Sequence, residues 1–114
     1  MRISAFSAAL KGVDSTENED TIFSSESAGL FIVCDGMGGH RAGLTASSLA
    51  CAEISGFLSK NLPPSDESES LAGSGAIRKI IEDAVQHACR EVYMHAEGHS
   101  DCKGMGTTLS MLLV

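Results

Sequence analysis

The sequence predicts an α+β domain in which strands near both ends of the chain flank two helices. Three observations support this prediction. A short, continuously apolar run at 29–34 is typical of a buried strand, and a second apolar run begins at 107. Between them, segments 42–60 and 77–92 space their apolar residues as helices do. Because 114 residues can bury one modest hydrophobic core, we expect one domain at most.

The strand signals come first along the chain. Residues 3–10 alternate loosely between apolar and polar types, which predicts a half-buried strand. A polar, acidic loop is predicted at 11–20, followed by a short strand at 21–23. The apolar run at 29–34 predicts a strand that ends at Asp35, and the glycine-rich segment 36–40 predicts a tight turn.

The two helices follow this turn. The first is predicted at 42–60 and is separated from the second by a solvated, proline-containing loop at 61–74. Apolar residues between 77 and 92 fall on one helical face, and Gly98 is well placed to end that helix. After a glycine turn at 104–106, a strand is predicted from 107. Because the sequence ends inside this apolar strand, we expect residues 1–114 to be an incomplete domain.

Composition and charge exclude two classes of protein. The formal net charge is −7, with eight basic and fifteen acidic residues, whereas nucleic-acid binders need clustered Lys and Arg. No apolar run approaches the roughly 18 residues of a membrane span, and no signal-peptide core follows Met1. We therefore expect a cytoplasmic protein without nucleic-acid or membrane partners. The four cysteines form no CxxC pair and are interpreted as reduced, buried thiols: Cys34, Cys51, Cys89 and Cys102.

The segment 33–43 carries the strongest chemical signal. A buried strand delivers the carboxylate of Asp35 to its end, and glycines and a helix follow at once. Such a turn suits a hard divalent cation, bound by Asp35 and by the carbonyl oxygen of Gly36. A nucleotide site is less well supported, because an aspartate repels phosphate and neither a clean GxGxxG nor a Walker lysine is present. A third interpretation is that Asp35 only caps the helix.

A second acidic pair precedes the strand predicted at 21–23. If that strand lies antiparallel to the strand carrying Asp35, Glu19 and Asp20 approach the same cation from the other side. Acidic residues on a surface loop are usually only solvated, so Glu19 and Asp20 indicate a metal site chiefly in combination with Asp35.

Three segments in order resemble the type 2C metal-dependent protein phosphatases, particularly their bacterial members. Residues 18–20 (Asn-Glu-Asp) resemble the family's N-terminal acidic motif. Residues 31–40, with Gly43, Ala46 and Ser47, resemble the DGMGGHxxGxxAS signature, and 104–109 are similar to the MGTTL strand start. The resemblance covers essentially the whole chain, which is identified as the N-terminal portion of a phosphatase domain.

This resemblance implies a four-layer α/β/β/α sandwich with antiparallel sheets, of which the chain would form about half. It implies two or more Mn²⁺ or Mg²⁺ ions in the complete domain, with Asp35 bridging two of them. The Gly36 carbonyl, Glu19 and Asp20 complete the metal-binding residues, the two acids mainly through water. A metal-bridging hydroxide would hydrolyse phosphoserine and phosphothreonine in proteins, opposing a serine/threonine kinase.

The sequence also departs from the family pattern. The usual phosphate-binding arginine is replaced by Ser15, which lacks a bidentate fork for phosphate, and Lys11 is a candidate substitute. Leu44 stands where many relatives have Glu. The later GDSR, SDG and DN motifs are absent, so the chain alone is expected to lack metal ligands.

These departures leave alternatives open. The chain would also suit a non-catalytic, pseudophosphatase-like module that binds a phosphoprotein or another partner. A zinc site from His95, His99, Asp101 and Cys102 is disfavoured because Gly98 interrupts the helix between the histidines. We expect a structural role for His40, which follows the glycine turn.

Overall fold

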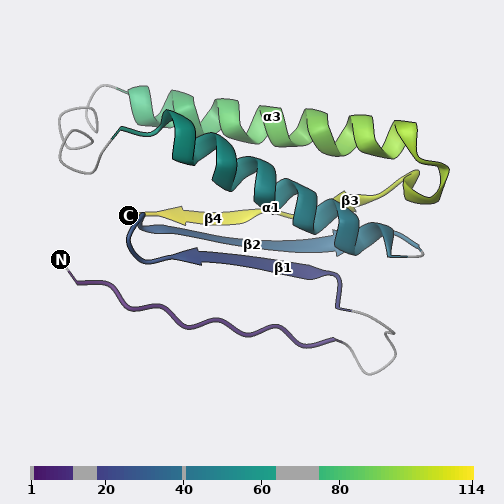
Figure 1. Cartoon of the computed structure of the whole chain (residues 1–114), viewed down its shortest axis with the longest axis horizontal. Coiled ribbons are helices and arrows are strands. Elements are labelled where there is room, and N and C mark those ends of the chain that lie inside the picture. Colours follow the sequence, from purple (N-terminus) through teal and green to yellow (C-terminus); the bar gives the residue numbers. More distant parts are fainter. Residues whose placement is uncertain (1, 12–17, 40, 64–74) are drawn as a thin grey trace.

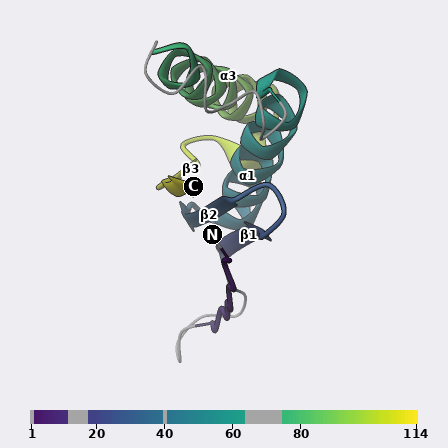
Figure 2. The ribbon, with the colours of Figure 1, turned by 90° about the vertical axis from the view of Figure 1, so that its left-hand side faces the viewer.

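The computed structural model describes residues 2–11, 18–39, 41–63 and 75–114. Both helices lie on the same side of one antiparallel sheet, so the fold is α+β as predicted (Figures 1 and 2). In chain order the elements are β1 (Asp20–Ser25), β2 (Leu30–Met37), α1 (Ala42–Asn61), α3 (Ala76–Gly98), the short 3-10 helix η1 (Ser100–Cys102), β3 (Gly106–Thr107) and β4 (Ser110–Leu113).

Strand β2 is the centre of the sheet. It pairs with β1 over six residues, from Asp20 opposite Asp35 to Ser25 opposite Leu30. Its other edge pairs first with β4 and then, beyond it, with β3, which lies opposite Gly36 and Met37. All these pairings are antiparallel, which confirms the predicted arrangement of the strands at 21–23 and 29–34.

The hydrophobic core lies between β2 and the helices. Side chains of β2 alternate, so that Leu30, Ile32 and Cys34 are buried against the helices while Val33 and Asp35 are exposed on the other face. The residues that α1 and α3 contribute to this core share an inward-facing stripe: Ala50, Cys51, Ile54, Leu58, Ala84 and Ala88. Periodic apolar spacing in the sequence therefore predicted both core helices correctly.

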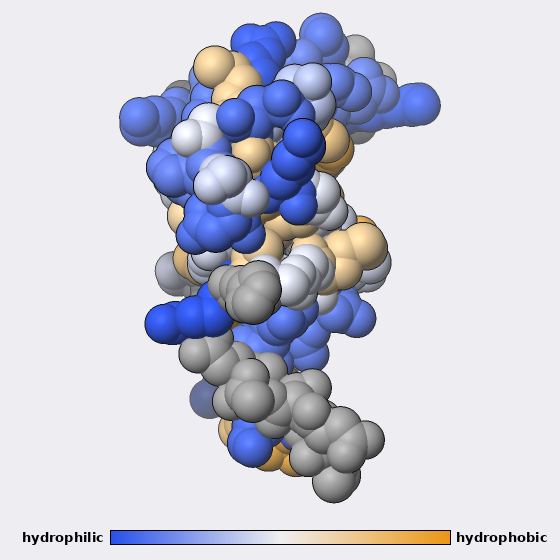
Figure 3. All heavy atoms as spheres, turned by 90° about the vertical axis from the view of Figure 1, so that its right-hand side faces the viewer, coloured by the Kyte–Doolittle hydropathy of each residue, from blue (hydrophilic) through white to orange (hydrophobic). Residues whose placement is uncertain are grey.

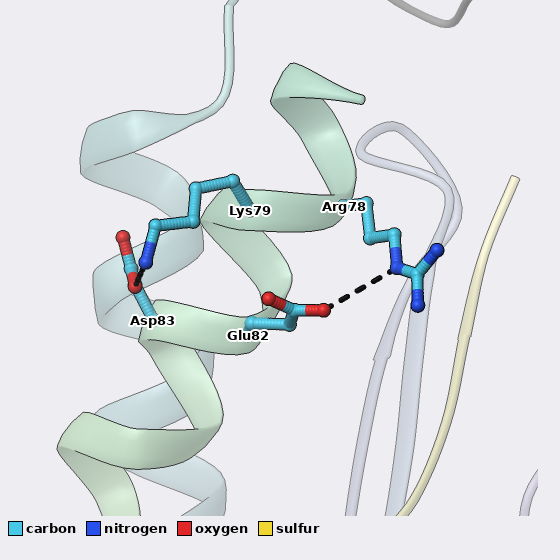
Figure 4. Close-up of polar contacts among 4 residues, drawn as sticks. All are labelled: Arg78, Lys79, Glu82 and Asp83. Atoms are coloured by element: carbon cyan, nitrogen blue, oxygen red, sulfur yellow. Dashed lines mark hydrogen bonds and ion pairs between the residues drawn. The ribbon is translucent and has the colours of Figure 1, made fainter. Parts of the chain in front are cut away.

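Helix α3 packs mainly against α1, and small residues let the two helices approach closely. His87 Nε2 and Glu53 Oε2, 2.7 Å apart, join the helices at a partly exposed position. Two exposed pairs on α3, Arg78 with Glu82 and Lys79 with Asp83, lie one helical turn apart (Figure 4). Because these charges are exposed and screened by water, the pairs add little to stability, and packing on α1 matters more than surface charge.

Predictions for three strand segments and for the burial of one cysteine were wrong in part or in full. Residues 3–10 form no strand; Ala5 N–H donates to the Glu26 side chain at 3.0 Å, and Phe6 is 98% exposed. Strand β2 runs to Met37 instead of ending at Asp35, because β3 provides hydrogen-bond partners there. The strand predicted from 107 is divided into β3 and β4 at 108–109, where the Thr108 hydroxyl and N–H bond to the Asp35 backbone. Cys89 is exposed, whereas the other three free cysteines are buried.

Helix α3 extends from the predicted stripe to Gly98, its final residue, as the sequence indicated. Neither helix in the described ranges is both long and apolar enough to cross a membrane. Part of the predicted loop at 61–74 lies outside the described residues, as do Ser15 and His40.

Candidate functional site

Asp20 and Asp35 lie directly opposite each other at one end of the β1–β2 ladder. Cross-strand partners project to the same face of a sheet, and here that is the face away from the helices. Asp20 is half-buried and Asp35 is exposed, so both carboxylates are near water. The strand pairing thus brings together two of the predicted metal-binding residues.

The two carboxylates influence each other electrostatically. Partial burial raises the pKa of Asp20, and the hydrogen bond to Asp35 and the charge of Asp35 raise it further. The folded chain therefore holds a proton on Asp20 more tightly than the unfolded chain does. Above that raised pKa the charged Asp20 carboxylate is repelled by Asp35, which lowers the stability of the fold; a proton or a cation on Asp20 would relieve the repulsion.

Glu19 is held between β2 and α1 through its backbone. Its carbonyl oxygen accepts hydrogen bonds from Gly36 N–H at 3.1 Å and from Ser47 Oγ at 2.7 Å. The Ser47 side chain is fully buried, and its hydroxyl also lies 2.8 Å from Thr21 Oγ1. These contacts tie the start of β1 to the first turns of α1.

Close packing around two glycines positions the Glu19 side chain. A methyl group on Gly36 would overlap the backbone carbonyl of Gly43, and one on Gly43 would overlap the Glu19 carboxylate. The carboxylate therefore lies against the first turn of α1, where the helix dipole favours negative charge. Glycine is thus required at Gly36 by close approach to backbone, whereas a side chain on Gly43 would displace the Glu19 carboxylate.

The turn between β2 and α1 is strained and lacks a side-chain cap. Arg41, the N-cap residue of α1, has a left-handed φ of 72°, which costs a non-glycine residue free energy. No side-chain hydrogen bond caps the helix at this residue. The interpretation of Asp35 as the helix cap is therefore wrong; its backbone is instead held by Thr108.

The donor atoms at this end of the sheet suit a hard cation. The carboxylates of Asp20 and Asp35 and the neighbouring Gly36 carbonyl are oxygen ligands of the kind that Mg²⁺ and Mn²⁺ prefer, whereas the Glu19 carboxylate lies against the first turn of α1. Within the described ranges, however, no cluster of three or more His, Cys, Asp or Glu side chains is close enough to hold a metal ion. These residues fit one side of a cation site but do not complete it.

The histidines at the end of α3 adopt a different arrangement. The rings of His95 and His99 stack with their centroids 4.0 Å apart, and His99 Nδ1 lies 2.9 Å from the His95 carbonyl oxygen. One ring nitrogen of His99 is therefore engaged with the helix end. Lys11, suggested as a phosphate-binding substitute, is exposed at the end of the segment 2–11.

Sequence reasoning missed the supporting roles of Ser47 and Thr108. Both residues lie inside the recognised motifs, but a hydroxyl that bonds to a backbone 28 or 73 positions away leaves no periodic signal. Their presence in the motifs was the available clue.

We predict opposite effects from two Gly→Ala substitutions. Gly36→Ala should lower the free energy of unfolding by about 1–3 kcal/mol, because the added methyl overlaps the Gly43 backbone. Gly56→Ala, at an open position inside α1, should raise it by about 0.5–1 kcal/mol. Urea denaturation measures both. Equal effects of the two substitutions on the free energy of unfolding would contradict the close approach of Gly36 to the Gly43 backbone.

We also predict a pH-dependent effect of Asp20→Asn. At pH 7 the metal-free variant should be more stable than the parent chain, because the charge repulsion is removed. As the pH falls through the raised pKa of Asp20, the parent gains its proton and the difference should shrink. Urea midpoints at pH 7 and pH 4 test this, and a difference that grows on acidification would refute it.

The sequence matches the Protein phosphatase 2C family over residues 12–114. The serine/threonine phosphatase stp of Listeria innocua is 36% identical over 80 residues, covering 70% of this chain and 29% of that protein. The serine/threonine protein phosphatase PstP of Mycobacterium tuberculosis is 31% identical over 103 residues, covering 90% of this chain and 18% of that protein. The chain thus spans less than a third of the length of these relatives.

Solved structures agree with this match. The M. tuberculosis phosphatase PstP/Ppp superposes with a TM-score of 0.71 at 31% identity, over 94% of this chain and 40% of that one. The PstP catalytic domain in complex with two manganese ions superposes with a TM-score of 0.70 at 30% identity, over 94% of this chain and 41% of that one. Stp1 from Staphylococcus aureus superposes with a TM-score of 0.64 at 30% identity, over 100% of this chain and 44% of that one. The two helices and the sheet match part of these domains, and the chain belongs to the protein phosphatase 2C family of serine/threonine phosphatases.

Proposed function

We propose that residues 1–114 form the N-terminal portion of a phosphatase domain and supply one side of its two-cation catalytic centre. The observation that supports this most strongly is the placement of Asp20 directly opposite Asp35 at one end of the sheet. The likeness to a PstP catalytic domain solved with two manganese ions favours the same interpretation. The proposed reaction is hydrolysis of phosphoserine and phosphothreonine in phosphoproteins, opposing a serine/threonine kinase.

Four residues would bind the cations. Asp35 and Asp20 offer the paired carboxylates, Glu19 a further carboxylate, and Gly36 its backbone carbonyl. Mn²⁺ or Mg²⁺, when bound, would lower the pKa of water and neutralise the charge on phosphoryl oxygens. Other residues of the chain position these ligands: Thr108 holds the Asp35 backbone by a hydrogen bond, and Ser47 holds the Glu19 backbone in the same way.

These donors are too few for two ions that each take about six oxygen ligands. Further ligands would have to come from outside the described residues. We therefore expect the chain alone to bind a cation weakly and to turn over substrate slowly or not at all. Its fold nevertheless presents the Asp20–Asp35 pair in a defined register, so the proposal can be tested on this chain.

We predict that Mn²⁺ raises the melting temperature of the chain and that Asp35→Asn abolishes the increase. Because the same substitution removes charge repulsion, the metal-free variant should melt above the metal-free parent. Asp101→Asn, at an exposed position of η1, is the matched control and should leave the Mn²⁺ response unchanged. Equal stabilisation of the parent and Asp35→Asn by Mn²⁺ would count against the site.

Catalysis is tested by a chimera in which this chain replaces the matching segment of the M. tuberculosis PstP catalytic domain. Mn²⁺-dependent release of phosphate from a phosphothreonine peptide should fall at least about 100-fold with Asp35→Asn, because a direct cation ligand is lost. Undiminished turnover in the variant would contradict the proposal. Phosphopeptide binding without turnover in the parent chimera would favour the non-catalytic alternative.

A further inference from the structure

A buried hydroxyl group lies beneath the start of β1. Ser47 is fully buried, and in the described part of the chain it is the one buried residue with a polar or charged side chain. The other buried residues of α1 are glycine, alanine, cysteine, isoleucine and leucine, so packing on the sheet does not itself require a hydroxyl there. Because a buried hydroxyl is costly unless it is hydrogen-bonded, the partners of Ser47 indicate what this residue does.

The start of β1, the end of β2 and the start of α1 lie together at one end of the molecule (Figure 1). Figure 3 views the molecule from that end, where hydrophilic surface lies above and below an apolar band. Ser47 is fully buried and therefore contributes nothing to this surface. It can act on the acidic pair only through the residues that lie between them.

The hydrogen bonds of Ser47 have a defined direction. Its hydroxyl lies 2.7 Å from the Glu19 carbonyl oxygen and 2.8 Å from Thr21 Oγ1, and the Leu44 carbonyl oxygen is more distant at 3.3 Å. A carbonyl oxygen can only accept, so the single proton of Ser47 is donated to Glu19, and Thr21 donates to Ser47. The result is a chain of hydrogen bonds from Thr21 through Ser47 to Glu19, in which each bond polarises and strengthens the next.

The Glu19 carbonyl also belongs to the β1–β2 ladder. It accepts the Gly36 N–H at 3.1 Å, so by antiparallel alternation Glu19 and Gly36 form a hydrogen-bonded pair. The next pair, Asp20 with Asp35, is then a non-hydrogen-bonded pair, and Asp20 N–H donates to Asn18 Oδ1 at 3.0 Å instead. Side chains approach more closely in such a pair, but neighbouring bonds must hold the two strands together there.

We propose that the hydroxyls of Thr21 and Ser47 position the acidic pair of the proposed cation site. Acting through the Glu19 carbonyl, they hold Asp20 at a fixed spacing from Asp35. This role rests on the proposed function, because it gives the two hydroxyls a part in cation binding. Without them this end of the ladder would keep its backbone hydrogen bond but lose its tie to α1. The two carboxylates would then be held less often at the spacing that one cation needs.

Matched substitutions separate this role from general stability. Ser47→Ala and Thr21→Val, the hydroxyl-removing variants, each delete one member of the hydrogen-bond chain. Thr21→Ser keeps its hydroxyl, and Ser48→Ala removes an exposed hydroxyl that bonds only to carbonyl oxygens within α1. These two are the control variants.

The first readout is Mn²⁺ affinity, measured from the electron paramagnetic resonance signal of free Mn²⁺ at a temperature where every variant is folded. The hydroxyl-removing variants should bind Mn²⁺ at least about tenfold more weakly than the parent, because residues that orient metal ligands affect affinity to this degree. The control variants should bind as the parent does. A purely stabilising role would leave the affinity of the folded chain unchanged.

The second readout needs no metal. In a non-hydrogen-bonded antiparallel pair the Hα atoms of the two residues face each other, so their NMR cross-peak reports the pairing. Asp20 with Asp35 is such a pair, and Ile22 with Val33, two positions further along the ladder, is the internal reference. The first cross-peak should weaken relative to the reference in the hydroxyl-removing variants and keep its strength in the control variants.

Two results would overturn the proposal. One is an Asp20–Asp35 cross-peak that keeps its parental strength relative to the reference in both hydroxyl-removing variants. The other is a Mn²⁺ affinity that falls equally in the hydroxyl-removing and the control variants. A parent chain that binds no Mn²⁺ would count against the proposed function, and the cross-peaks would then decide the positioning role. Circular dichroism shows whether Ser47→Ala folds; if it does not, Thr21→Val and Thr21→Ser decide the outcome.

Discussion

The antiparallel ladder between β1 and β2 determines the positions of the acidic residues. Its register sets Asp20 opposite Asp35, and a shift of one residue would move one of them to the helix side of the sheet. The register is held at this end by the Glu19 carbonyl, which accepts hydrogen bonds from β2 and from Ser47 of α1. Buried residues of β2, packed against α1, hold the rest of the ladder in place.

Several features of this end of the molecule lower the stability of the metal-free fold. Partial burial and the neighbouring Asp35 raise the pKa of Asp20, and Arg41 adopts a left-handed conformation at the start of α1. A side chain on Gly36 would overlap backbone atoms, and one on Gly43 would have to displace the Glu19 carboxylate. Such costs concentrate where a site must be built in a particular geometry, and here they are offset by the core around Ile32 and Ile54. The strained turn and the acidic pair are thus both features expected of a functional site.

Much of this arrangement is accessible from the sequence. The buried strand at 29–34 was predicted from its continuous apolar run, the first helix from its apolar and small residues, and the apolar stripe of the second helix from its 3.6-residue period. The meeting of Asp20 with Asp35 followed from antiparallel pairing of short neighbouring strands. Residues 3–10 were predicted wrongly because alternation indicates a strand only where a partner edge accepts it. The roles of Ser47 and Thr108 depend on tertiary contacts that leave no local pattern.

The central claim, that Asp20 and Asp35 together bind a divalent cation, is tested most directly by paramagnetic NMR. Substoichiometric Mn²⁺ should broaden the amide signals of residues 19–21 and 34–37 first, because Mn²⁺ would lie next to both strand ends. Asp35→Asn should remove this selective broadening. Broadening centred instead on His95 and His99, or unchanged in Asp35→Asn, would contradict the account.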